Sequence, residues 1–211
     1  MKGILITFEG IDYSGKTTQA KKLFNYLKRK GHKVIFLREP GGEKISENIR
    51  QVLLSSRNTG MSSLTELLLY MASRAQLVSK VILPALKQGK IVICDRFYDS
   101  SLAYQGYGRG LEKKAIEYLN KISVSGLKPH LTILIDIPLK IFVQRMRKNN
   151  KKKDRIEKEK IDFYKKVRGG YLKIAEKDKR RFRMIDGSGE IKEVWDKVQP
   201  LVDSLLKTNK I

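Results

Sequence analysis

Residues 10–17, GIDYSGKT, match the pattern G-x-x-x-x-G-K-[ST] at every fixed position. An apolar run precedes them and an amphipathic helical pattern follows, which is the context that this pattern requires. Glycines at this spacing let backbone N–H groups point inward around a phosphate, and the start of the following helix adds the positive end of its dipole. The sequence therefore predicts a strand, a phosphate loop and a helix that together bind a nucleoside triphosphate.

Apolar runs alternate with helical patterns along the rest of the chain. The runs predict five buried strands, at residues 4–9, 33–37, 91–94, 131–136 and 182–185. The helical patterns run from the phosphate loop to about residue 29 and over residues 46–54, 64–87, 112–121, 138–147, 157–176 and 191–206. This alternation predicts an α/β fold with a parallel sheet covered on both faces. At 211 residues, 41% of them hydrophobic, we expect a single domain over residues 1–211.

The chain is strongly basic, with 45 lysine and arginine residues against 22 acidic ones and a formal charge of +23. One interpretation is a polyanionic partner, which makes a nucleic-acid-binding ATPase an alternative function. The other is a basic surface spread over solvated helices. Stretches such as LEKKAIEYLNK place lysines at helical spacing beside acids, and this favours an ordinary surface and disfavours nucleic acid.

Two features bear on the compartment. The single cysteine, Cys94, cannot form an internal disulfide, which is typical of a reducing cytoplasm. The longest apolar runs are shorter than the roughly 18 residues that a membrane-spanning helix needs. We therefore expect a cytoplasmic protein without a membrane partner.

The acid–base pair Asp95-Arg96 follows the third predicted strand and helps to sort the nucleotide-binding classes. A GTPase should carry an N-K-x-D sequence, but the Asn-Lys pairs at Asn120 and Asn209 lack the aspartate. A hydrolytic motor should carry adjacent acids after this strand. An arginine there suits a second anionic substrate, so the pair favours a kinase.

Residues 147–160, RKNNKKKDRIEKEK, have no apolar periodicity. We expect this polar segment to bury nothing and to form a mobile excursion at the surface. On a domain that binds phosphate, a basic flap over about residues 145–160 would serve as a lid.

Five stretches of the chain resemble a known family. They are FEGIDYSGKTTQ (8–19), REPGG (38–42), LLLYMASRAQ (67–76), DRFYDSSLAYQG (95–106) and DRIE (154–157). Together, in this order, they make essentially the whole chain similar to thymidylate kinases of the bacterial type, within the nucleoside monophosphate kinase superfamily. The resemblance implies a P-loop three-layer α/β/α fold with a five-stranded parallel sheet in the order 2-3-1-4-5 and a short mobile lid. It also implies ATP-dependent phosphorylation of dTMP to dTDP in dTTP synthesis, with Mg²⁺, in a homodimer.

The resemblance also implies roles for individual residues. ATP would be bound by Gly10, Ile11, Asp12, Tyr13, Ser14, Gly15, Lys16, Thr17, Thr18 and Arg145. dTMP would be bound by Glu9, Asp12, Arg38, Tyr70, Arg74, Arg96, Ser101, Tyr104 and Gln105. The catalytic residues would be Lys16, Asp95, Arg96, Arg147 and Arg155. Mg²⁺ would be held by Glu9, Thr17 and Asp95, partly through water.

Several of these roles are specific. Tyr70 would stack on thymine and Arg74 would hydrogen-bond the O4 edge of the base, while Tyr104 would crowd the 2′ carbon of the sugar. Asp12 would accept a hydrogen bond from the 3′-hydroxyl, and Arg96 would bridge the acceptor phosphate and the transferring group. Without the resemblance, Tyr70 would be interpreted as core, Arg74 as a solvated helix charge and Arg96 equally well as an ion-pair partner of Asp95.

Tyr13 departs from the family pattern. Some thymidylate kinases carry an arginine directly after the loop aspartate, and others have a small residue there and supply arginines from the lid. Because a tyrosine cannot supply a cation, we expect the lid type, with Arg147 and Arg155 near the phosphates and Arg145 stacked on adenine. The role of Tyr13 itself stays open at this point.

Overall fold

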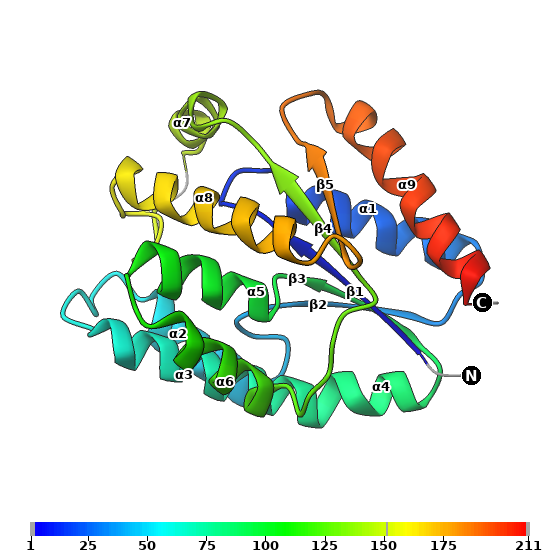
Figure 1. Ribbon diagram of the computed structural model, residues 1–211, viewed down its shortest axis with the longest axis horizontal. Coiled ribbons are helices and arrows are strands. Elements are labelled where there is room, and N and C mark those ends of the chain that lie inside the picture. Colours follow the sequence, from blue (N-terminus) through cyan, green and yellow to red (C-terminus); the bar gives the residue numbers. More distant parts are fainter. Residues whose placement is uncertain (1–2, 151, 210–211) are drawn as a thin grey trace.

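The protein is described by a computed structural model over residues 3–150 and 152–209. A five-stranded sheet crosses its centre, with helices on both faces (Figure 1). The strands are β1 (Ile4–Glu9), β2 (Val34–Arg38), β3 (Ile91–Asp95), β4 (Leu131–Asp136) and β5 (Phe182–Asp186). All the pairings are parallel and the spatial order is β2-β3-β1-β4-β5. The α/β class and the strand order 2-3-1-4-5 are therefore confirmed.

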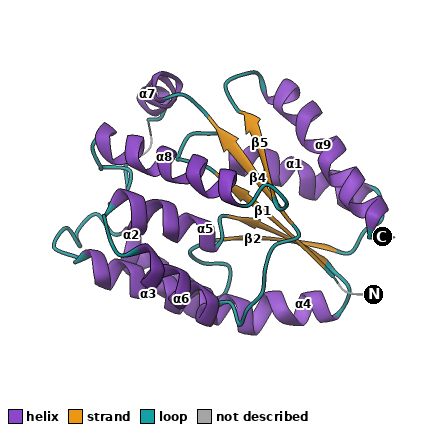
Figure 2. Cartoon of the chain, in the orientation of Figure 1, coloured by secondary structure: helices purple, strands orange, loops and turns teal. Residues whose placement is uncertain are grey.

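Helical segments connect the strands (Figure 2). They are α1 (Lys16–Arg29), α2 (Lys44–Leu54), α3 (Ser63–Leu77), η1 (Val78–Ile82), α4 (Leu83–Lys87), α5 (Tyr98–Ser101), η2 (Leu102–Gly108), α6 (Lys113–Ser123), α7 (Leu139–Lys148), α8 (Ile161–Lys177) and α9 (Ile191–Thr208). The π-helical segment η1 joins α3 to α4, so the long helix predicted at residues 64–87 is continuous. Within the described part of the chain, no helix is long and apolar enough to cross a membrane.

The sheet buries its two faces against different helices. Ile4, Ile6 and Phe8 of β1 belong to a core that includes residues of α1 and α9. Leu5 points to the opposite face and packs in a core with residues from η1 and from β3, among them Cys94. This alternation is the period of two that a pleated strand imposes, with both sides buried as in a parallel sheet. Cys94 is a free, buried core residue.

The helical region at residues 98–108, formed by α5 and η2, was not predicted. Its sequence, YDSSLAYQGYG, is rich in serine and glycine, which have modest or poor helix propensity. Tertiary packing accounts for it, since a Cβ on Gly108 would lie 2.6 Å from Phe163 of α8. Helix α8 also begins at Ile161 rather than at residue 157, β3 and β5 each end one residue later than predicted, and β2 begins and ends one residue later.

The prediction that the polar segment at residues 147–160 buries nothing is wrong. Ile156 is only 5% exposed and belongs to an apolar cluster with Phe142 of α7 and Tyr164 of α8. Arg155 is 8% exposed and its Nη1 donates to Glu66 Oε2 at 2.6 Å. Residue 151, which is also part of the predicted lid, lies outside the described residues. The end of the segment is therefore docked onto the protein by the apolar side chain of Ile156 and by two ion pairs, Arg155–Glu66 and Glu159–Arg109.

Candidate active site

The phosphate loop joins β1 to α1 at the carboxyl edge of the sheet. Gly10 has φ 139°, and a Cβ there would lie 2.3 Å from the Ile135 carbonyl oxygen of β4. Gly15 has φ 93° and precedes α1, where Lys16 and Thr17 begin the helix. Both glycines are required, because one position has no space for a side chain and both have positive φ angles that favour glycine. Ile11 is buried beneath the loop.

A cavity of about 560 Å³ opens beside the loop. Of the residues predicted to bind ATP, the cavity is lined by Tyr13, Ser14, Gly15, Thr18 and Arg145. Its opposite wall is formed by residues 187–191, between β5 and α9. Arg145 of α7 spans the two walls, since Nη1 donates to the Ser14 carbonyl at 3.2 Å and Nη2 donates to the Gly187 carbonyl at 2.8 Å. The guanidinium thus holds the loop at a fixed distance from the β5–α9 connection.

A second cavity of about 100 Å³ lies on the other side of the loop aspartate. Of the residues predicted to bind dTMP, it is lined by Asp12, Tyr70, Arg96, Ser101, Tyr104 and Gln105. These residues come from the loop, from α3 and from the turn and helical region after β3. The structure therefore brings together residues that are widely separated in the sequence.

Three charged residues that sequence reasoning missed also line the second cavity: Glu39, Arg50 of α2 and Asp154 of the polar segment. Arg50 Nη1 donates to the Pro40 carbonyl at 2.9 Å, and burial together with the charge of Arg38 lowers the Arg50 pKa. Burial raises the pKa of Asp154. The sequence carries no local signal for Arg50 beyond its place on a helix that follows REPGG.

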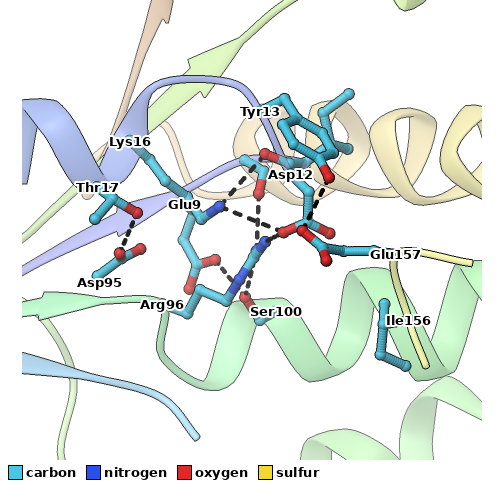
Figure 3. A network of polar contacts seen from close by, with 12 residues as sticks. Glu9, Asp12, Tyr13, Lys16, Thr17, Asp95, Arg96, Ser100, Ile156 and Glu157 are labelled. Atoms are coloured by element: carbon cyan, nitrogen blue, oxygen red, sulfur yellow. Dashed lines mark hydrogen bonds and ion pairs between the residues drawn. The ribbon is translucent and has the colours of Figure 1, made fainter. Parts of the chain in front are cut away.

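Arg96 and Asp12 line the second cavity and contact each other beside the phosphate loop (Figure 3). Arg96 Nη2 donates to Asp12 Oδ1 at 2.5 Å and Nη1 donates to the Gly10 carbonyl at 2.8 Å. Burial alone would raise the Asp12 pKa, but the charges of Arg96 and Lys16 outweigh it and lower the pKa to about 2. Burial alone would lower the Arg96 pKa, whereas Tyr104 and Asp12 raise it above its usual value. Both groups are therefore charged at neutral pH.

Glu9 lies behind Arg96 and lines neither of these two cavities. It is fully buried, and its Oε1 accepts from the Phe97 backbone N–H at 2.7 Å. Its Oε2 accepts from the hydroxyls of Ser100 at 2.6 Å and Tyr171 at 2.8 Å. Burial, and then the charge of Asp99, raise the Glu9 pKa to about 7. These contacts make Glu9 a brace for the turn that carries Arg96, which has φ 72°, and they occupy both oxygens predicted to bind substrate or metal.

Thr17 and Asp95 face each other at the start of α1 and the end of β3. The Thr17 hydroxyl donates to Asp95 Oδ2 at 2.5 Å. Asp95 Oδ1 is buried and accepts no hydrogen bond from the described residues, 3–150 and 152–209. A hydroxyl and a carboxylate oxygen are hard ligands of the kind that Mg²⁺ prefers, so this pair fits the ion. Arg38 lines a neighbouring cavity of about 340 Å³ together with Thr17 and Asp95.

Three arginines predicted to touch the substrates lie elsewhere in this arrangement. Arg74 is 1% exposed and sits behind the second cavity, where Nε donates to Glu39 at 2.7 Å and Nη1 donates to Ser101 Oγ at 3.0 Å. Arg147 is exposed on α7 and lines neither cavity. Arg155 is paired with Glu66. Their contacts with substrate therefore stay predictions.

The fold is a parallel sheet with a phosphate loop, and Arg96 contacts that loop while lining a second cavity. These features define the class of P-loop kinases that phosphorylate a second small substrate. A family model described as thymidylate kinase matches residues 8–198. The thymidylate kinase of Kosmotoga olearia is 49% identical over 92% of this chain and 93% of its own length, and that of a Sulfurihydrogenibium species is 49% identical over 96% and 97%. The crystal structure of thymidylate kinase from Ehrlichia chaffeensis superposes with a TM-score of 0.79 at 37% identity, covering 96% of this chain and 99% of that one.

The chain belongs to the thymidylate kinase family. This membership confirms the resemblance that the five sequence stretches indicated.

Proposed function

We propose that the protein transfers the γ-phosphoryl group of ATP to dTMP and releases dTDP and ADP, a step in dTTP synthesis. The loop cavity takes ATP and the cavity lined by Tyr70 takes dTMP. In the reaction an oxygen of the dTMP phosphate forms a bond to the γ-phosphorus. The bond from that phosphorus to the bridging oxygen breaks, and its electron pair stays on the β-phosphate of ADP.

The observation that carries this proposal is the position of Arg96, which lines the second cavity and donates to the Gly10 carbonyl of the phosphate loop. A phosphate monoester has a second pKa of about 6, so the attacking oxygen is already ionised near neutral pH and needs no general base. The protein must instead align two polyanions and offset their repulsion. Arg96 can donate to both, while Lys16 and the loop amides hold the donor phosphates.

We propose that Thr17 and Asp95 hold Mg²⁺, with its remaining ligands coming from the ATP phosphates and water. The bound ion would neutralise charge on the phosphates. The unpaired Asp95 Oδ1 supports this proposal. Glu9 would act indirectly, through the turn that it braces, because its oxygens already accept three hydrogen bonds from the protein.

The remaining roles are proposals as well. Arg145, on the wall of the loop cavity, is placed to contact the donor nucleotide. Arg155 would have to leave Glu66 to reach a phosphate, and Arg147 would have to turn in from the surface of α7. We propose that the residues of this chain act as one domain, with about 145–160 as its lid, in the cytoplasm.

We also propose that the protein is a homodimer. Helices α3 and α6 lie side by side (Figure 1) and expose large apolar residues. Leu64 and Leu68 of α3 are 55% and 47% exposed, while Tyr118 and Ile122 of α6 are 66% and 57% exposed. Each pair is four residues apart, so its members share one face of their helix. A second copy of the chain would remove these side chains from water.

An acceptor panel tests the proposed reaction. ADP release would be followed with ATP and Mg²⁺ and with dTMP, dUMP, dCMP, AMP or thymidine as the acceptor. We expect dTMP to be turned over fastest, and a faster reaction with another acceptor would contradict the assignment.

The nucleic-acid alternative makes a separate prediction, namely a gel shift of single-stranded DNA at physiological salt and stimulation of ATP turnover by that DNA. We expect neither.

A further inference from the structure

The side chain of Tyr13 extends from the phosphate loop to two positions of the predicted lid, Asn149 and Glu157. Its hydroxyl donates to Glu157 Oε1 at 2.9 Å and accepts from Asn149 Nδ2 at 3.1 Å. Its ring meets Phe142 of α7 edge-on, with the centroids 5.7 Å apart. Burial raises the Tyr13 pKa to about 12, so the hydroxyl keeps its proton and remains a donor at neutral pH. One loop residue thus contacts three separate positions of the following elements.

The backbone at Tyr13 has φ 60°, in the left-handed region that residues with a Cβ enter reluctantly. A glycine would relieve this conformation. The side chain must therefore contribute enough through its contacts to offset the strained backbone, and the hydroxyl pair and the Phe142 contact are the contacts that it makes.

Glu157, which accepts from the Tyr13 hydroxyl (Figure 3), belongs to a hydrogen-bonded turn at residues 154–157. Its second oxygen, Oε2, accepts from the Asp154 backbone N–H at 3.0 Å. Asp154 Oδ1 in turn accepts from the backbone N–H groups of Ile156 and Glu157, both at 2.9 Å. These hydrogen bonds join the residues of the turn to one another, and the Tyr13 hydroxyl joins the turn to the phosphate loop.

This turn also forms part of the acceptor cavity. Asp154 and Ile156 both line that cavity, whereas Tyr13 lines the donor cavity on the other side of the loop. A hydrogen bond from Tyr13 to Glu157 consequently connects a wall of one cavity with a wall of the other.

We propose that Tyr13 is a positioning residue for phosphoryl transfer, which through Glu157 and Asn149 holds the 154–157 turn in register with the phosphate loop. The inference rests on the proposed function of the two cavities. It assigns to this side chain the alignment of the acceptor wall with the donor phosphates, a role that does not require Tyr13 to touch the reacting atoms.

Tyr13→Phe tests the proposal, because it keeps the ring and the Phe142 contact and removes only the hydroxyl. Loss of a hydrogen bond to a charged group should lower kcat about tenfold, with the KM values for ATP and dTMP changing less than about twofold. Glu157→Gln should give a comparable loss, and the double variant should lose little more than either single one. Tyr26→Phe is the matched control, since it also removes a tyrosine–carboxylate bond, 2.8 Å to Asp203, between α1 and α9. It should leave kcat unchanged.

A structural measurement separates this inference from the proposed reaction. Amide hydrogen exchange at residues 154–157 should become faster in Tyr13→Phe and stay at the wild-type rate in Tyr26→Phe. If the wild-type protein did not turn over dTMP, the proposed function would fail, and exchange would still report on the turn. Unchanged exchange, a kcat within about twofold of wild type, or additive losses in the double variant would each overturn the role given to Tyr13.

Discussion

Replacing Asp12 with asparagine removes the negative charge between Arg96 and Lys16 and keeps an oxygen that can still accept from Arg96. The Asp12 carboxylate is held between two cations, with Lys16 Nζ at 3.7 Å from Oδ1 and the Arg96 guanidinium in direct contact. The variant leaves these cations without their counterion in a partly buried site. We expect the folded state to lose stability even though the shape of the side chain is nearly unchanged.

The magnitude follows from the Asp12 pKa, which is about 2 in the folded protein against 3.8 for an ordinary aspartate. That difference corresponds to about 2 kcal/mol of folding free energy at pH 7. Because the folded pKa is the lower one, the contribution is complete above pH 3.8 and is lost as the pH falls through about 2. The difference between wild type and variant should therefore shrink to about half its value by pH 3.

Urea unfolding, followed by circular dichroism at several pH values, measures this quantity. Asp203→Asn is the matched control, because Asp203 pairs with Lys30 at 3.2 Å at the surface and such pairs contribute less than about 1 kcal/mol. An Asp12→Asn variant as stable as wild type at pH 7 would refute the reasoning. So would a loss that is as large at pH 3 as at pH 7.

Three further variants test the proposed chemistry and assembly. Arg96→Lys keeps the charge but loses the planar fork that can donate to both substrates, so steady-state kinetics should show kcat lowered about 100-fold. Asp95→Asn removes a charged ligand from the proposed ion site. A titration of activity with Mg²⁺ should show that the concentration needed for half-maximal activity rises at least about tenfold, and an unchanged concentration would exclude Asp95 as a ligand. Leu68→Lys places a charge on the exposed face of α3, and light scattering should then report a monomer where wild type gives a dimer.

Local sequence signals were sufficient for the parts of the fold that depend on local physics. The glycines at positions 10 and 15 predicted a phosphate loop between a strand and a helix, and the structure has β1, a loop with positive φ at both glycines, and α1 in that order. Apolar runs predicted every strand of the described sheet, and helical patterns predicted every described helix longer than ten residues, to within a few residues. The helical region at residues 98–108 was missed because its serines and glycines favour no helix on their own. It forms because it packs against α8, which lies more than 50 residues further along the chain.

The wrong predictions at the site have the same cause, namely contacts between residues that are far apart in the sequence. The polar segment was predicted to bury nothing because a lysine-rich stretch has no apolar face, yet Arg155 is buried against Glu66, 89 residues away in the sequence. A distant acidic partner of that kind leaves no local signal. Arg74 shows the same effect, since its guanidinium bonds to Glu39 and to Ser101, which lie on different elements. Sequence motifs predicted which residues lie near the site, but the ion-pair partners of Arg155 and Arg74 could be identified only from the folded structure.

Tyr13 bears on the role that was predicted for the lid arginines. A loop without an arginine after Asp12 was expected to rely on arginines of the lid for positive charge near the phosphates. In the structure the arginines that line the donor and acceptor cavities are Arg145, Arg50 and Arg96, whereas Arg155 of the 154–157 turn is paired with Glu66. We infer that the turn is held from two sides, by Glu66 of α3 through its ion pair with Arg155 and by Tyr13 of the phosphate loop through Glu157. Both contacts act on the turn that forms a wall of the acceptor cavity. At this position Tyr13 therefore supplies no charge but connects a wall of the donor cavity with a wall of the acceptor cavity.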